Sequence, residues 1–141
     1  MSDYLRQFAH RFAALDKHNL ATLRELYSTD AVFCDPLHEV RGLGKLQAYF
    51  AQMYANADQL RFDFYGFDQV ADGEGYLRWT MSYSHPRLAG GQLIRLEGCS
   101  HLRWRDGLVH QHRDYFDAGA LLYEHLPLLG TAIRWLKRRL L

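Results

Sequence analysis

The 141-residue sequence has few of the features that assign a function directly. It contains only two cysteines, Cys34 and Cys99, and their spacing fits neither a zinc knuckle nor a disulfide framework. His110 and His112 are close enough to begin a metal site, but no third ligand is obvious, so no metal is expected. No uninterrupted apolar run approaches the roughly 20 residues that a membrane-spanning helix requires, and we find no apolar leader. We therefore expect a soluble, cytoplasmic protein.

An excess of charge of either sign is also absent. The sequence has 17 lysines and arginines against 16 aspartates and glutamates, which gives a formal net charge of +1. Because such a chain creates no strong overall field, nucleic acid is not an expected partner. Apolar residues, in contrast, make up 48% of the sequence, and the length allows a sizeable core. We expect one globular domain that spans residues 1–141.

The first part of the chain has helical periodicity. After a possible cap at Ser2 or Asp3, apolar residues recur at helical spacing and predict a helix that ends near residues 17–19. The following residues predict a short helix over 20–27, a strand within "STDAVFCDP" (28–36) and a third helix over 43–56.

From Leu60 onward the apolar period changes to two. Extended segments are predicted over residues 61–70, 75–84, 92–104 and 108–117, and turn residues separate them. Four such segments in succession predict an antiparallel meander. Together with the helices they indicate an α+β fold, in which the helices cover one face of a long curved sheet.

Alternation predicts which residues of these strands point toward the helices. The inward set is Leu77, Trp79, Met81 and Tyr83 in the second segment, and Ile94, Leu96, Gly98, Ser100, Leu102 and Trp104 in the third. In the fourth segment neither parity is apolar, because His112 and Asp114 share one face and Gln111 and Arg113 the other. Periodicity alone leaves the orientation of this strand open.

The tail over about residues 120–141 is predicted to be an amphipathic helix. Its apolar stripe contains Leu129, Ile133, Leu136 and Leu140, and its basic residues are Arg134, Lys137, Arg138 and Arg139. Three interpretations stay open. The helix can dock on the body of the protein, form part of a dimer contact, or lie on an anionic membrane surface with Trp135 at the interface.

The order of these segments resembles the nuclear transport factor 2-like superfamily, and within it the SnoaL-like group of polyketide cyclases. The resemblance is carried by Asp30-Ala31-Val32, Asp35-Pro36, Gly42 and "HRDYFD" (residues 112–117). It implies a cone-shaped curved antiparallel sheet whose concave face is covered by the N-terminal helices, and a homodimer formed through the outer sheet face. It does not fix the chemistry, since this scaffold hosts both enzymes and binding domains.

Two families within the superfamily point to particular residues. Ketosteroid isomerases carry their catalytic base in an Asp-Pro pair that Asp35 matches, but their oxyanion donors correspond to Phe12, which cannot donate a hydrogen bond, and Ser100. Limonene-epoxide hydrolases carry an "RDYFD" motif whose first aspartate matches Asp114, but the second aspartate of their catalytic set is missing here. The resemblance to both families implies that the face of the last strand with His112 and Asp114 lines a pocket.

These observations predict an acid/base site in an apolar pocket. Asp35 and Asp114 are the predicted catalytic carboxylates, and His112 is expected to share or relay a proton. The predicted substrate-binding residues are Phe12, Phe33, Phe50, Trp79, Met81, Tyr83, Ser100 and Phe116. The expected reaction is isomerisation, cyclisation, dehydration or hydrolysis of a hydrophobic small molecule, without a cofactor.

The same residues also have a purely structural interpretation. Asp35 stands before a proline, which is typical of a turn in which the carboxylate accepts backbone N–H groups. Asp114 can simply pair with Arg113, Arg78 or His112. The protein would then be a non-catalytic module of the same fold that binds a lipid-like ligand or a partner protein.

Overall fold

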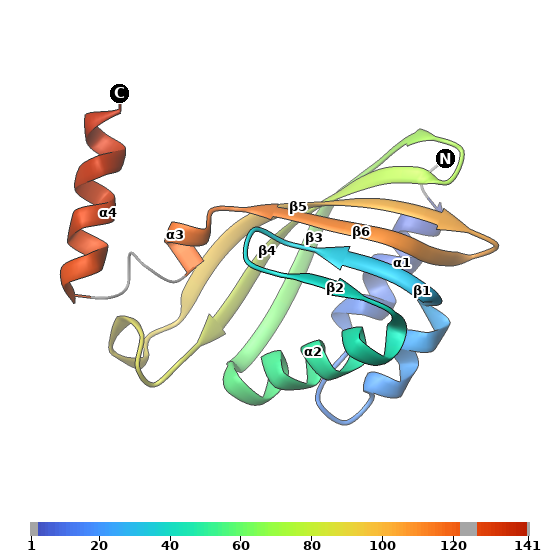
Figure 1. Ribbon diagram of the computed structural model, residues 1–141, viewed down its shortest axis with the longest axis horizontal. Coiled ribbons are helices and arrows are strands. Elements are labelled where there is room, and N and C mark those ends of the chain that lie inside the picture. Colours follow the sequence, from blue (N-terminus) through green and yellow to red (C-terminus); the bar gives the residue numbers. More distant parts are fainter. Residues whose placement is uncertain (1–2, 122–126, 141) are drawn as a thin grey trace.

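The computed structural model of the protein describes residues 3–121 and 127–140 (Figure 1). It has the α+β architecture that the sequence predicts. In chain order the elements are α1 (Asp3–Ala13), the 3-10 helix η1 (Leu20–Glu25), β1 (Tyr27–Cys34), β2 (Glu39–Arg41), α2 (Leu43–Asn56), β3 (Asp58–Ala71), β4 (Glu74–Ser84), the 3-10 turn η2 (Ala89–Gly91), β5 (Ile94–Arg105), β6 (Leu108–Phe116), α3 (Ala118–Leu121) and α4 (Pro127–Arg139).

The strands form a six-stranded sheet in the order β2-β1-β6-β5-β4-β3. The neighbours from β3 to β6 pair antiparallel, which confirms the predicted meander. Strand β1 pairs antiparallel with β2 and parallel with β6, so an early segment of the chain lies beside the last strand. Figure 1 shows a curved, unclosed sheet with α1 and α2 on its concave side.

The core fills the space between the concave face and the helices. All four predicted inward residues of β4 are buried, as are Ile94, Leu96, Ser100 and Leu102 of β5. Apolar side chains of α1 and α2, including Phe12 and Phe50, belong to the same cluster. At its centre the indole of Trp79 lies opposite Gly98 and fills the space that a side chain at position 98 would need.

The first helix is shorter than predicted, because two polar side chains build a turn after it. Helix α1 ends at Ala13, before the expected end near residues 17–19. The side chain of Asn19 accepts the Asp16 N–H at 2.7 Å and donates to the Ala14 carbonyl at 2.9 Å, while Asp16 accepts the His18 N–H at 2.7 Å. Such bonds offer the backbone an alternative to the helix.

Two further elements differ from the expectation. The second helix is a 3-10 helix, and the three-residue strand β2 was not predicted. A strand of this length contains too few residues to display an alternating pattern.

The last strand contains an irregularity that explains its ambiguous pattern. Trp104 of β5 pairs with Val109, whereas Arg103 pairs with Gln111, so His110 is an extra residue in β6. A bulge of this kind moves the following side chains to the other face of the strand. Val109 and His112 are consequently both buried, although regular alternation would separate them.

Helix α4 lies at one end of the molecule, beyond α3 (Figure 1). Lys137 forms an ion pair with Asp117, and Ile133 packs close to Gly119. The apolar side chains that remain exposed on or beside this helix are Leu129, Trp135, Leu136 and Leu140. Within residues 3–121 and 127–140, none of the helices is both long and apolar enough to cross a membrane.

The packing of Trp79 against Gly98 leads to a stability prediction. A Cβ at position 98 would lie 2.3–2.7 Å from three atoms of the indole ring. We expect Gly98→Ala to lower the free energy of unfolding by about 1–3 kcal/mol, because the core would be overpacked.

Urea titration would measure this change, with Gly44→Ala as the matched control. Gly44 lies in α2, and a Cβ at this position would meet open space, so its replacement should leave stability unchanged or raise it. An unchanged stability of Gly98→Ala would contradict the close packing of Trp79.

Candidate active site

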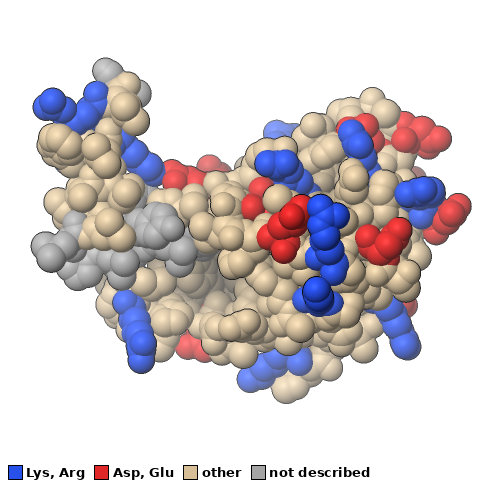
Figure 2. Space-filling view, viewed as in Figure 1, with Lys and Arg blue, Asp and Glu red and all other residues tan. Residues whose placement is uncertain are grey.

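A cavity of about 670 Å³ opens on the concave side of the sheet. It is bounded by α2, the turn between β1 and β2, and the loop between β4 and β5, and the surface is hollowed on this side of the molecule (Figure 2). Its apolar lining consists mainly of Phe12, Leu37, Phe33, Phe50, Met53, Ala57, Leu60, Phe62, Trp79, Met81, Leu88 and Phe116. Its polar lining consists of Asp35, His38, Tyr49, Gln52, Asn56, Tyr83, His85, Arg87 and Asp114.

The structure brings most of the predicted site residues to this cavity. Both carboxylates, Asp35 and Asp114, line it together with seven of the predicted substrate-binding residues. The two exceptions are His112 and Ser100. They border an adjoining void of about 10 Å³, which Asp114 also lines, and therefore lie behind the carboxylate as seen from the cavity.

A buried row of hydrogen bonds holds the Asp114 carboxylate. Its Oδ1 lies 2.6 Å from Nε2 of His112 and accepts a hydrogen bond of 2.5 Å from the hydroxyl of Ser100. Behind these groups, Nδ1 of His112 lies 2.7 Å from the hydroxyl of Tyr27, and the indole N–H of Trp79 donates to Ser100 at 2.8 Å. The row thus joins β1, β4, β5 and β6.

The chemistry of these groups gives the row a direction. A carboxylate accepts but does not donate, so in the neutral imidazole Nε2 carries the proton that points to Asp114. Nδ1 then accepts the proton of the Tyr27 hydroxyl. Two donors consequently converge on Oδ1 of Asp114. Within the part of the chain that the structure describes, no group hydrogen-bonds to the other oxygen, Oδ2.

This pairing decides between the structural partners that the sequence left open for Asp114. His112 is its hydrogen-bond partner, whereas Arg78 pairs with Asp68 and Arg113 lies over the ring of Tyr115.

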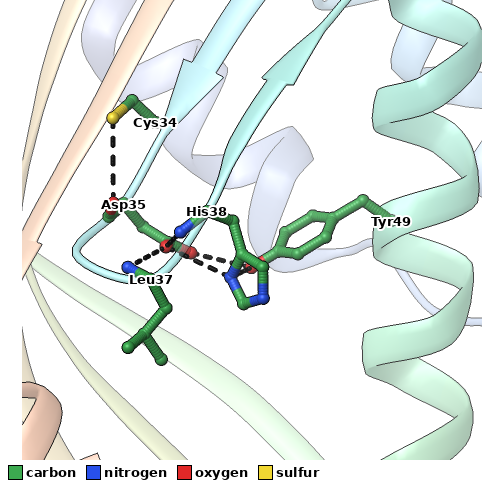
Figure 3. Close-up of polar contacts among 5 residues, drawn as sticks. All are labelled: Cys34, Asp35, Leu37, His38 and Tyr49. Atoms are coloured by element: carbon green, nitrogen blue, oxygen red, sulfur yellow. Dashed lines mark hydrogen bonds and ion pairs between the residues drawn. The ribbon is translucent and has the colours of Figure 1, made fainter.

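Asp35 has a different environment, which Figure 3 shows. Its Oδ1 accepts the backbone N–H groups of Leu37 and His38 at 2.8 and 2.7 Å and lies 3.3 Å from Nδ1 of His38. Its Oδ2 accepts the hydroxyl of Tyr49 at 2.7 Å. The carboxylate therefore organises the β1–β2 turn, as the structural interpretation of the sequence expected, and also fixes a phenol of α2 at the cavity wall.

Tyr49 remains protonated in this environment. Burial raises its pKa, and the hydrogen bond to Asp35 and the negative charges of Asp35 and Asp114 raise it further. The cavity wall therefore carries a neutral hydroxyl beside a carboxylate.

Sequence reasoning missed three residues of this site: Tyr27, His38 and Tyr49. Tyr27 and Tyr49 lie in the segments 20–27 and 43–56, whose spacing predicts helices in which both tyrosines count only as apolar positions. A tyrosine in a predicted core is a usable signal, because its buried hydroxyl requires a partner. The sequence does not indicate which partner is chosen.

The described residues contain no cluster of three or more histidines, cysteines or acids arranged to hold a metal ion. Cys34 and Cys99 are free thiols, and burial raises the pKa of the Cys99 thiol, which disfavours the reactive thiolate.

The hydrogen bond between Tyr27 and His112 leads to a prediction. Tyr27→Phe would leave the buried Nδ1 of His112 without a donor, so we expect the free energy of unfolding to fall by about 1–3 kcal/mol. Urea titration of the wild type and the variant would measure this change in the free energy of unfolding. The control is Tyr115→Phe, since Tyr115 is half exposed on β6, and its change should stay within about 0.5 kcal/mol. Equal effects of the two replacements would argue against the buried bond.

The buried phenols also predict a dependence on alkaline pH. Burial raises the pKa of Tyr54 to about 12 and that of the fully buried Tyr27 well above its usual value. Above about pH 10 the unfolded chain releases these protons while the folded chain retains them. Stability should therefore be fully present below pH 10 and fall as the pH rises through the folded pKa values, which urea titrations across this range would detect. A stability that stays constant to about pH 12 would contradict the burial of these hydroxyls.

Comparison with known proteins identifies a family that this chain matches. The SnoaL-like domain family model matches residues 6–112. A search of curated proteins found no significant match.

Solved structures of low sequence identity share the fold. A protein of ketosteroid isomerase-like fold from Catenulispora acidiphila, solved in complex with trimethylamine, is 12% identical with a TM-score of 0.71, over 85% of this chain and 89% of that one. A structure designated a polyketide cyclase from Acidithiobacillus ferrooxidans is 12% identical with a TM-score of 0.71, over 89% and 96% of the two chains. One designated a SnoaL-like polyketide cyclase from Jannaschia sp. CCS1 is 18% identical with a TM-score of 0.68, over 84% and 85%.

The family match extends from α1 to the histidine that holds Asp114, and the neighbours share the curved sheet around it. The chain belongs to the SnoaL-like domain family.

Proposed function

We propose that this protein is a cofactor-independent acid/base enzyme that acts on a hydrophobic small molecule, with Asp114 as the group that accepts the proton. One observation carries the proposal. Asp114 lines the cavity, and its Oδ1 is held by His112 and Ser100, while no described residue hydrogen-bonds to its Oδ2. A carboxylate oriented in this way has one oxygen available to a ligand.

Proton abstraction fits the rest of the cavity. Oδ2 would take a proton from carbon or oxygen of the bound molecule, while His112 and Ser100 keep the carboxylate oriented. The apolar part of the lining limits the contact of the reacting groups with water, so the charge that shifts during the transfer is less screened than in solution. Isomerisation, cyclisation, dehydration and hydrolysis all contain such a step.

Asp35 has a positioning role in this proposal. Its oxygens accept hydrogen bonds from the β1–β2 turn and from Tyr49, so it is less available than Asp114 as a base. It holds the protonated Tyr49 hydroxyl at the cavity wall, where the hydroxyl can bind an oxygen of the substrate on which negative charge develops.

The alternative is a binding module without turnover. The polar row that holds Asp114 is also what a stable core requires, since among the described residues every buried side-chain nitrogen and oxygen has a partner. A neighbour of this fold was solved in complex with trimethylamine, and two others are designated polyketide cyclases.

The Kemp elimination of 5-nitrobenzisoxazole would test the proposal without knowledge of the natural substrate. A base removes the proton on the ring carbon, the nitrogen–oxygen bond breaks, and its electrons pass to oxygen as a coloured phenolate is formed. We expect the protein to accelerate this reaction and Asp114→Asn to lower the rate about 100-fold, the lower end of general-base contributions.

Asp63→Asn is the matched control, because Asp63 is an exposed carboxylate of β3 that pairs with Arg61. It should leave the rate unchanged. Equal rates for the wild type and Asp114→Asn would contradict the assignment and favour the binding module.

A further inference from the structure

We infer that the ligand of this cavity is an amphiphilic anion, whose apolar body lies against the aromatic walls and whose negatively charged group binds Arg87 at the mouth. The inference concerns the substrate class of the proposed enzyme and therefore rests on the same cavity. It depends on the distribution of charge along the lining.

Arg87 is the one arginine or lysine among the described residues that line the cavity. It lies in the loop between β4 and β5 and is exposed, whereas Asp114 is largely buried. The two charges therefore occupy different depths of the cavity. The register of the sheet places Phe116, Trp79 and Met81 on the side of Asp114 that leads to this loop, and all three line the cavity.

Arg87 has no acidic partner among the described residues. Arg11, Arg61 and Arg78 each form an ion pair with a carboxylate. The backbone N–H of Arg87 donates to Nδ1 of His85 at 3.1 Å, so the loop itself is folded by a local bond. The guanidinium is left to bind a carboxylate or similar anion, which its planar donors match well.

The two carboxylates of the cavity do not require a cationic ligand. Asp35 accepts two backbone N–H groups and the Tyr49 hydroxyl, and Oδ1 of Asp114 accepts from two donors. A ligand with a positive group at the mouth would instead be repelled by Arg87. An anionic group at the mouth stays away from Asp114 and leaves the apolar, proton-donating part of the ligand beside Oδ2.

Three probes of nearly the same shape distinguish an anionic, a neutral and a cationic ligand. They are 2-naphthoate, 2-naphthalenemethanol and 2-naphthylmethylammonium. Their dissociation constants would be measured by isothermal titration calorimetry at low salt with the full chain. We expect naphthoate to bind most tightly, and Arg87→Gln to weaken naphthoate about tenfold while the affinity for the neutral alcohol stays unchanged. The unchanged affinity for the alcohol also shows that the variant is folded.

Arg95→Gln is the matched control, because Arg95 is an exposed arginine of β5 that does not line the cavity. It should not alter the affinity for naphthoate. Tighter binding of the alcohol or the ammonium compound, equal weakening by Arg95→Gln, or no binding of any probe would overturn the inference. If naphthoate binds through Arg87 as expected but the protein shows no Kemp reaction that depends on Asp114, the proposed catalysis alone would be overturned.

Discussion

A buried imidazole holds this structure and its site together. His112 is 4% exposed and is surrounded by the rings of Phe8, Phe12 and Phe33, so water cannot satisfy its nitrogens. An unpaired polar group in such a place is costly, and the two bonds to Tyr27 and Asp114 remove that cost. The bond to Tyr27 requires β1 to lie beside β6 in the observed parallel register, where Phe33 is opposite His112, whereas Asp114 follows His112 on β6 itself. The imidazole that bonds an early strand through Nδ1 therefore also holds the carboxylate at the cavity through Nε2.

The two carboxylates of the cavity show how their surroundings separate their roles. Asp35 follows β1 directly and meets backbone N–H groups of its own turn, which occupy it before any ligand arrives. Asp114 lies within a strand, where neighbouring backbone groups are already used by the sheet, so its partners are the side chains of Ser100 on β5 and of His112 on β6 itself. These reach only one of its oxygens. The apolar concave face of the curved sheet thus presents to the cavity a carboxylate that is hydrogen-bonded through only one of its oxygens.

The sequence predicted those parts of the structure that repeat a simple pattern. All four residues that the alternation of β4 predicted to face the core are buried, and the order of helices and strands identified the fold. The prediction from the sequence failed where one residue or one side chain alters the pattern. The bulge at His110 reverses the faces of β6. The side chains of Asp16 and Asn19 end α1 early. In the site, the resemblance pointed to Asp35, His112 and Asp114, which the structure brings to one region. The hydroxyls of Tyr27 and Tyr49 could not be predicted as partners, because each lies far along the chain from the group that it contacts.

The most direct measurement is the position of the hydrogen atoms in the row that ends at Asp114, which neutron diffraction from a deuterated crystal would give. We predict deuterium on the Tyr27 hydroxyl pointing to Nδ1 of His112, deuterium on Nε2 pointing to Oδ1 of Asp114, and no protein donor at Oδ2. Deuterium on Nδ1 with none on Nε2, or a protein donor bound to Oδ2, would contradict a carboxylate held from behind and open to the cavity.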